Sequence, residues 1–185
     1  MDKRAQIIAR ALRLLVENGI HATPMSAIAK AANTGMGTIY HHFATKEALI
    51  NGIYIDIKEK EAILLTQPID EGSTQARFET YYTRVIHFYL ENPYYFRFMQ
   101  QLQHSPIITE ESRQQGYQAI QPVIDILEEG QKLQVIKDIS LEEILHFLGG
   151  TVFSYLGWAL NDPSAMEKNS SLSDQLLMTW DGIKK

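Results

Sequence analysis

Residues 23–46 of the chain read TPMSAIAKAANTGMGTIYHHFATK. Apolar residues recur at helical spacing on both sides of Asn33-Thr34-Gly35, where asparagine and glycine tolerate the left-handed backbone that a sharp reversal needs. We expect Thr23 to cap the first helix and Pro24 to occupy its first position. The stretch therefore predicts two short helices joined by a tight turn, which is a helix-turn-helix.

The second of these helices, expected over residues 36–43, has one apolar side. At about 100° per residue, Ile39 and Phe43 fall together and are expected to face inward. The opposite side carries groups that can approach base edges in a DNA groove, namely Gly37, Thr38 and His41. The flanks and the start of the next helix carry donors suited to phosphate, namely Tyr40, His42 and Lys46.

The alternative for this segment is a plain three-helix packing unit whose surface happens to be polar. An ordinary solvated helix would carry Glu, Lys and Gln on that surface, whereas Gly-Thr-Tyr-His-His is a poor helix surface by propensity. The composition of the exposed side therefore favours contact with DNA.

Charge is unevenly distributed along the chain, whose net charge is −5. Residues 1–50 carry six basic and three acidic groups, a balance of +3, and residues 51–185 carry eleven and nineteen, a balance of −8. A basic end can meet phosphate, and an acidic body is repelled from it. Chance asymmetry remains the alternative when charge alone is considered.

Length and composition exclude several classes of protein. The chain has 185 residues, 45% of them hydrophobic and 21% charged, which is typical of a globular protein. It has no cysteine, which excludes disulfides and thiolate metal sites and fits a reducing compartment. No apolar run reaches the roughly 20 residues of a membrane span, and the start lacks a signal-peptide pattern. We expect a cytoplasmic protein without a membrane partner.

Helical periodicity continues through the rest of the chain, without β-alternation. A breaker cluster at residues 68–74 is the expected internal linker. Helices are expected over about 3–18, 46–65, 75–90, 93–103, 109–132 (kinked at Pro122), 141–160 and 171–183. The predicted fold is all-α with about nine helices. It has an N-terminal helix-turn-helix DNA-binding domain over residues 1–60 and a C-terminal helical domain over residues 61–185.

Residues 1–60 resemble the DNA-binding domain of TetR-family transcriptional regulators. The matching positions are Ile28-Ala29, Ala31-Ala32, Gly37-Thr38-Ile39-Tyr40, His42-Phe43 and Lys46-Glu47-Ala48-Leu49. The turn departs from the family pattern, because Asn33-Thr34-Gly35 stands where Gly-Val-Ser is usual. The resemblance implies DNA contact from Ser26, Gly35, Met36, Gly37, Thr38, Tyr40, His41, His42 and Lys46. It also implies a helical C-terminal domain that binds a ligand and forms a dimer.

The helix expected over residues 141–160 is apolar nearly all round. A helix with two apolar faces needs two partners, its own core and a second subunit, and its glycines allow close approach. We expect a homodimer seam formed with the last helix, through Phe147, Gly150, Thr151, Ser154, Leu176 and Trp180. The alternative is a monomer in which this helix is buried at the centre.

Aromatic side chains crowd the two helices expected over residues 75–103. Such a density can line an apolar cavity with a few polar tips. The predicted ligand pocket is formed by Tyr82, Phe88, Tyr89, Phe98, Met99, Tyr117 and Trp158. The alternative, which is favoured for any single one of these residues, is that it fills the core.

The function expected from these features is that of a DNA-binding transcriptional regulator. The sequence contains no G-x-S-x-G, no H-E-x-x-H, no Walker A motif and no cysteine nucleophile, so we expect no enzyme, cofactor or metal. We expect a dimeric repressor of operator sites on double-stranded DNA. A mostly apolar small-molecule effector that enters the C-terminal domain would release or change operator binding. The alternative is a helical protein-interaction module without ligand sensing.

Overall fold

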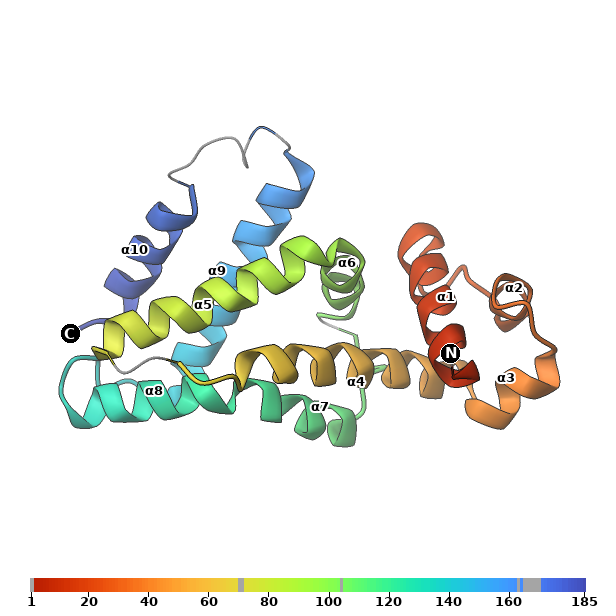
Figure 1. Ribbon diagram of the computed structural model, residues 1–185, viewed down its shortest axis with the longest axis horizontal. Helices are drawn as coiled ribbons and strands as arrows, with labels where there is room; N and C mark the ends of the chain where they lie inside the picture. Colours follow the sequence, from red (N-terminus) through yellow and green to blue (C-terminus); the bar gives the residue numbers. More distant parts are fainter. Residues whose placement is uncertain (1, 70–71, 104, 163, 165–170) are drawn as a thin grey trace. The chain divides into compact units, whose positions relative to one another are not determined.

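The computed structural model describes residues 2–69, 72–103, 105–162, 164 and 171–185. Within these ranges the chain forms ten α-helices, labelled in Figure 1, and one short 3-10 helix. Its only β-type pairing within the same ranges is an isolated bridge between Ile136 and Lys184. The predicted all-α fold is confirmed. None of the helices in the described ranges has the length and apolar character needed to cross a membrane.

The chain divides into two compact units, each built from two separate stretches of sequence. The first unit contains Met1–Lys60 and Asn92–Gly116, and the second contains Glu61–Glu91 and Tyr117–Lys185. The first unit thus combines the N-terminal helices with a later part of the chain. The predicted division into domains 1–60 and 61–185 stays a prediction.

The first unit holds the predicted helix-turn-helix. Its helices are α1 (Lys3–Asn18), α2 (Met25–Ala31), α3 (Met36–His42), the larger part of α4 (Lys46–Leu65), α6 (Pro93–Leu102) and most of α7 (Glu110–Tyr117). α1 packs against both α2 and α6, and α2 packs against α3. Fully buried aliphatic side chains form the core of this unit, among them Ile7, Leu15, Ile28, Ile39 and Ile53.

The second unit is organised around α5 (Thr74–Glu91). This helix packs against α8 (Gln121–Lys132), α9 (Leu141–Asn161) and α10 (Ser171–Ile183), as Figure 1 shows. Phe78 of α5 is completely buried, and its ring centroid lies 5.5 Å from that of Trp180 and 5.8 Å from that of Tyr82. Aromatic side chains therefore fill the centre of this unit.

One expected helix is divided into three. The sequence predicted a single helix over about 109–132 with a kink at Pro122, but the chain forms α7, a 3-10 helix η1 (Gln118–Ile120) and then α8. Pro122 lies in the first turn of α8, where a missing N–H leaves no hydrogen bond unmade. The predicted kink is therefore wrong, and the break raises the helix count above the expected nine.

The ends of the early helices differ from the prediction at the start of α2. Gly19 ends α1 at φ 88°, and the Ala48 N–H donates to Thr45 Oγ1 at 3.0 Å at the start of α4. Thr23, however, does not cap α2. Its buried hydroxyl has one proton to donate and lies 2.8 Å from the carbonyl of Gly19, which is free at the end of α1, and 3.2 Å from that of Leu14.

Candidate nucleic-acid interface

The turn between α2 and α3 depends on a single left-handed residue. Asn33 has φ 47°, and the Thr34 N–H donates to the Ala29 carbonyl at 3.0 Å. Gly35 is extended, at φ −77° and ψ 155°, and precedes α3 without a side-chain cap. The left-handed role predicted for the turn therefore belongs to Asn33 alone, and the backbone at Gly35 does not require glycine. A Cβ at Gly35 would meet no atom within 4 Å, so this position is open surface.

The two sides of α3 differ as the sequence predicted. Ile39 is fully buried and Phe43 is 4% exposed, which confirms the inward face. On the other side Gly37 and His41 are exposed, and Tyr40 is 49% exposed, an unusual degree for a tyrosine. The half-buried members of the predicted set on this helix are Met36, Thr38 and His42. All of the candidate DNA contacts on α3 thus retain some surface.

The two candidates outside the turn and α3 lie in neighbouring helices of the same unit. Ser26 is exposed near the start of α2. Lys46 is half-buried at the start of α4, and its Nζ donates to the His21 carbonyl at 3.4 Å. An ammonium group has three donors, so this single bond leaves Lys46 able to bind a phosphate. DNA contact by these residues stays a prediction.

Three consecutive aromatic residues lie in ring contact at the C-terminal end of α3. The His41 and His42 ring centroids are 5.4 Å apart, and those of His42 and Phe43 are 6.5 Å apart. The guanidinium of Arg4 lies over the Phe43 ring at 5.4 Å from its centroid. Local sequence patterns do not relate Arg4 to this site, because no helical spacing connects it to residues so far along the chain.

The predicted dimer face carries a groove in the second unit. The groove has a volume of about 590 Å³ and is lined by His146, Phe147, Gly150, Thr151, Ser154, Gln175, Met178 and Thr179. Beneath it, the Tyr82 hydroxyl donates to Thr151 Oγ1 at 3.0 Å, and Gln175 Nε2 donates to the Tyr82 hydroxyl at 3.1 Å. Four of the six predicted dimer residues therefore line one depression formed by α9 and α10.

The other two predicted dimer residues are less accessible. Leu176 is half-buried. Trp180 is only 4% exposed and packs against Phe78, so it belongs to the core of the second unit rather than to its surface. A residue that is buried in its own subunit has little area left for a partner, and Trp180 is therefore removed from the proposed interface.

The aromatic residues predicted to line a ligand pocket differ widely in burial. In the second unit, Tyr82, Phe88 and Tyr89 are 2%, 7% and 6% exposed, whereas Tyr117 and Trp158 are 56% and 42% exposed. In the first unit, Phe98 is fully buried and Met99 is half-buried. The three buried residues of the second unit fit the alternative of a filled core, and the pocket stays a prediction.

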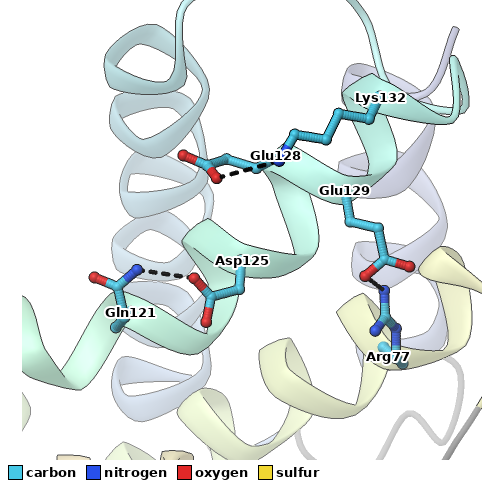
Figure 2. A network of polar contacts seen from close by, with 6 residues as sticks. All are labelled: Arg77, Gln121, Asp125, Glu128, Glu129 and Lys132. Carbon is cyan, nitrogen blue, oxygen red and sulfur yellow. Dashed lines mark hydrogen bonds and ion pairs between the residues drawn. The ribbon is translucent and has the colours of Figure 1, made fainter.

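A second hollow, also in the second unit, is lined in part by charged side chains. It has a volume of about 260 Å³, and its lining includes Pro68, Arg77, Pro122, Asp125 and Glu129. Figure 2 shows Arg77 of α5 paired with Glu129 of α8, with 2.6 Å between Nη2 and Oε2. Arg77 Nε is buried and has no hydrogen-bond partner among the residues that the structure describes. Helical periodicity does not predict this polar hollow, because its lining residues come from separate helices.

Within the described part of the chain, no three or more His, Asp or Glu side chains gather in a way that could hold a metal ion.

Two short helices joined by a tight turn, with open glycines and exposed donors on the second, define a helix-turn-helix module. Residues 7–53 match the sequence model of the bacterial regulatory proteins of the tetR family.

The HTH-type transcriptional regulator UidR of Escherichia coli strain K12 is 39% identical over 67 residues, which are 36% of this chain and 34% of UidR. The fatty acid metabolism regulator protein of Bacillus subtilis strain 168 is 41% identical over 58 residues, which are 31% of this chain and 28% of that protein. The chain therefore spans about a third of the length of the curated relatives it matches.

The fold is similar to solved structures along its whole length. A protein of Shewanella sp. PV-4, proposed to be a tetR-family transcription regulator, matches with a TM-score of 0.92 at 21% identity, over 100% of both chains. Salmonella enterica GusR matches with a TM-score of 0.74 at 24% identity, over 96% of this chain and 93% of GusR. Residues 7–53 thus match the tetR family in sequence, and the chain as a whole shares its fold with the Shewanella protein.

Proposed function

We propose that the protein is a transcriptional regulator that inserts α3 into the major groove of an operator. One observation carries this proposal: the exposed side of α3 presents an open glycine, Gly37, next to the exposed donors Tyr40 and His41. A missing side chain allows close approach to the groove floor, and hydroxyl and imidazole groups can reach base edges or phosphates.

The proposed contacts divide into two kinds. Gly37, Thr38 and His41 face the base edges and carry sequence selectivity. Donors on the flanks and neighbouring helices bind phosphates and fix the register of the protein on the duplex, namely Ser26, Tyr40, His42 and Lys46. Gly35 and Met36 lie at the start of α3, where the backbone comes close to the DNA. This division assigns selectivity and affinity to different side chains.

A homodimer is the second part of the proposal, because one short reading helix makes few base contacts. The seam is proposed on α9 and α10, where Phe147, Gly150, Thr151 and Ser154 line one groove. A Cβ at Gly149 or Gly150 would meet no atom within 4 Å, so a second helix can approach α9 closely. The dimer would present its two copies of α3 to half-sites about 34–36 Å apart, or a multiple of that distance.

Ligand-controlled repression is the third part. A mostly apolar effector bound in the second unit would release the operator only to the extent that it binds the two conformations with different affinity. The buried aromatic residues of α5 and the polar hollow beside Arg77 are the two regions of this unit to be tested with ligands. Because an operator lies on the chromosome, the proposal places the protein in the cytoplasm.

Selection of bound sequences from a pool of random duplexes tests the first part. The purified chain should enrich one motif at low salt, and Tyr40→Phe should then weaken binding to all sequences equally. The expected loss is roughly 1–3 kcal/mol, the contribution of one hydrogen bond to a charged group. Tyr117→Phe is the matched control, because Tyr117 is also an exposed tyrosine but lies in the second unit.

Two outcomes would count against this proposal. A loss that depends on the sequence of the duplex would show that Tyr40 reads bases rather than a phosphate. Absence of any duplex binding at low salt would favour the alternative, a helical protein-interaction module.

A further inference from the structure

We propose that Arg4, in the first turn of α1, is a further DNA-contacting residue and binds a backbone phosphate beside the C-terminal end of α3. This inference rests on the proposed function, since it concerns the same DNA surface. It adds a contact from a helix outside the helix-turn-helix.

The position of Arg4 is fixed by the residues at the end of α3. Its Cζ lies 5.4 Å from the centroid of the Phe43 ring, and Phe43 is the residue that ends α3. A Cβ at Gly52 would lie 2.8 Å from Phe43 Cε1 and 3.5 Å from Arg4 Nη2. The glycine at position 52 therefore leaves room both for the ring and for the cation above it.

The guanidinium of Arg4 remains available for a partner. Arg4 is exposed, and its side chain forms no ion pair with any carboxylate among the residues that the structure describes. Stacking uses the flat face of a guanidinium, whereas its N–H donors point outward in the plane, in a fork that matches phosphate oxygens. The nearest acid in sequence, Asp2, accepts a 3.3 Å hydrogen bond from the Arg4 backbone N–H, as a cap of α1.

A series of ring contacts connects the guanidinium of Arg4 to the proposed DNA contacts on α3. From Arg4 the contacts run through Phe43 to His42 and His41, with centroid separations of 6.5 Å and then 5.4 Å. His42 is one of the residues proposed to bind phosphate. Arg4 therefore extends the set of phosphate donors at the end of α3.

Arg13 provides the contrast on the same helix. It is also exposed and also stacks on an aromatic ring, with its Cζ 5.5 Å from the centroid of Tyr94 in α6. A carboxylate is present there, since the Tyr94 hydroxyl donates to Glu17 at 2.8 Å and this bond raises the pKa of Tyr94. Arg13 thus has the same chemistry as Arg4 without a contact to the end of α3.

The salt dependence of DNA binding separates the two arginines. Binding of the full chain to one duplex is measured over a range of salt concentrations, for the parent, Arg4→Gln, Arg13→Gln and Arg4→Lys. Each phosphate that is neutralised contributes about 0.9 to the slope of log affinity against log salt. Arg4→Gln should therefore lower the magnitude of the slope by about 0.9 and weaken binding to all sequences, whereas Arg13→Gln should not. Arg4→Lys should restore the slope, because the charge is retained.

The remaining outcomes are each decisive. A parent chain that binds no duplex refutes the proposed function itself. If the parent binds and Arg4→Gln keeps the parental slope, Arg4 contacts no phosphate and only this inference fails. Equal reductions for Arg4→Gln and Arg13→Gln would show a general effect of charge and would also overturn it. Thermal melting checks that each variant is folded, and Arg4→Lys provides a second folded comparison.

Discussion

The short helix α3 and the long helix α9 have an unusual feature in common. Both carry glycines at positions where a Cβ would meet no atom within 4 Å, namely Gly37 on α3 and Gly149 and Gly150 on α9. Glycine inside a helix destabilises it by roughly 0.5–1 kcal/mol relative to alanine, and no packing contact among the described residues compensates at these three positions. Both surfaces belong to the proposed function, one to DNA contact and the other to the dimer.

Other glycines in the same chain have the opposite environment. A Cβ at Gly52 would lie 2.8 Å from Phe43 Cε1, and a Cβ at Gly182 would lie 2.7 Å from Phe147 Cζ. At Gly52 the fold itself requires glycine, because Phe43 is only 4% exposed, whereas Phe147 beside Gly182 is 43% exposed. Gly52 is therefore explained by packing within the chain, whereas Gly37, Gly149 and Gly150 are not.

The two open surfaces differ in the partner that they fit. α3 has 7 residues and surrounds Gly37 with the donors Thr38, Tyr40 and His41, which suit a polyanion. α9 has 21 residues, and beside Gly150 it exposes Phe147, which is 43% exposed and suits an apolar protein surface. The same backbone feature thus supports DNA contact in one region and self-association in the other.

The largest expected effect comes from filling each open surface with a bulky side chain. Gly150→Leu should convert the dimer to a monomer, because the added side chain holds a second helix away from α9. Gly37→Leu should leave the dimer intact and abolish specific DNA binding, because it holds α3 away from the groove floor. Sedimentation and duplex binding are measured for both variants.

Each of these variants is the control for the other in one assay. A Gly150→Leu chain that still sediments as the parental dimer would place the seam elsewhere in the molecule. If the Gly37→Leu chain keeps its operator affinity, α3 does not enter the groove as proposed.

A smaller effect is expected where the fold itself requires glycine. Gly52→Leu places a side chain where Phe43 already packs, and overpacking of a core typically destabilises by about 1–3 kcal/mol. Urea unfolding should show this loss for Gly52→Leu and no comparable loss for Gly37→Leu, which has open space. Equal stabilities of the two variants would contradict the distinction between the two kinds of glycine.

The inward face of α3 could be predicted from the sequence because it depends only on local periodicity. Ile39 and Phe43 are one helical turn apart, so their common burial follows from helix geometry. The capping role assigned to Thr23 failed because a hydroxyl can donate as well as accept. The Thr23 hydroxyl donates to a carbonyl at the end of α1 instead of accepting from an N–H of α2.

Features that join distant parts of the chain were beyond local patterns. Trp180 was assigned to a dimer face because periodicity shows that a helix has two apolar sides but not which of them meets its own core; it packs on Phe78. The contact between Arg4 and Phe43 joins two helices that lie far apart in sequence, so no spacing rule could suggest it. The open groove of α9 and α10 likewise depends on tertiary packing.

The smallest expected effect is a gain in stability, and it tests the comparison most directly. Gly37→Ala and Gly149→Ala add a methyl group where nothing lies within 4 Å, so each variant should be more stable to urea by about 0.5–1 kcal/mol. If glycine is present at position 37 for approach to DNA, Gly37→Ala should gain stability and lose operator affinity with the dimer unchanged. Gly149→Ala should change operator affinity only through the dimer, which sedimentation measures separately. A Gly37→Ala chain that gains stability at no loss of operator affinity would show that α3 does not need its open glycine. The open glycines of α3 and α9 would then be similar in composition only, because contact with DNA would not explain the glycine at position 37.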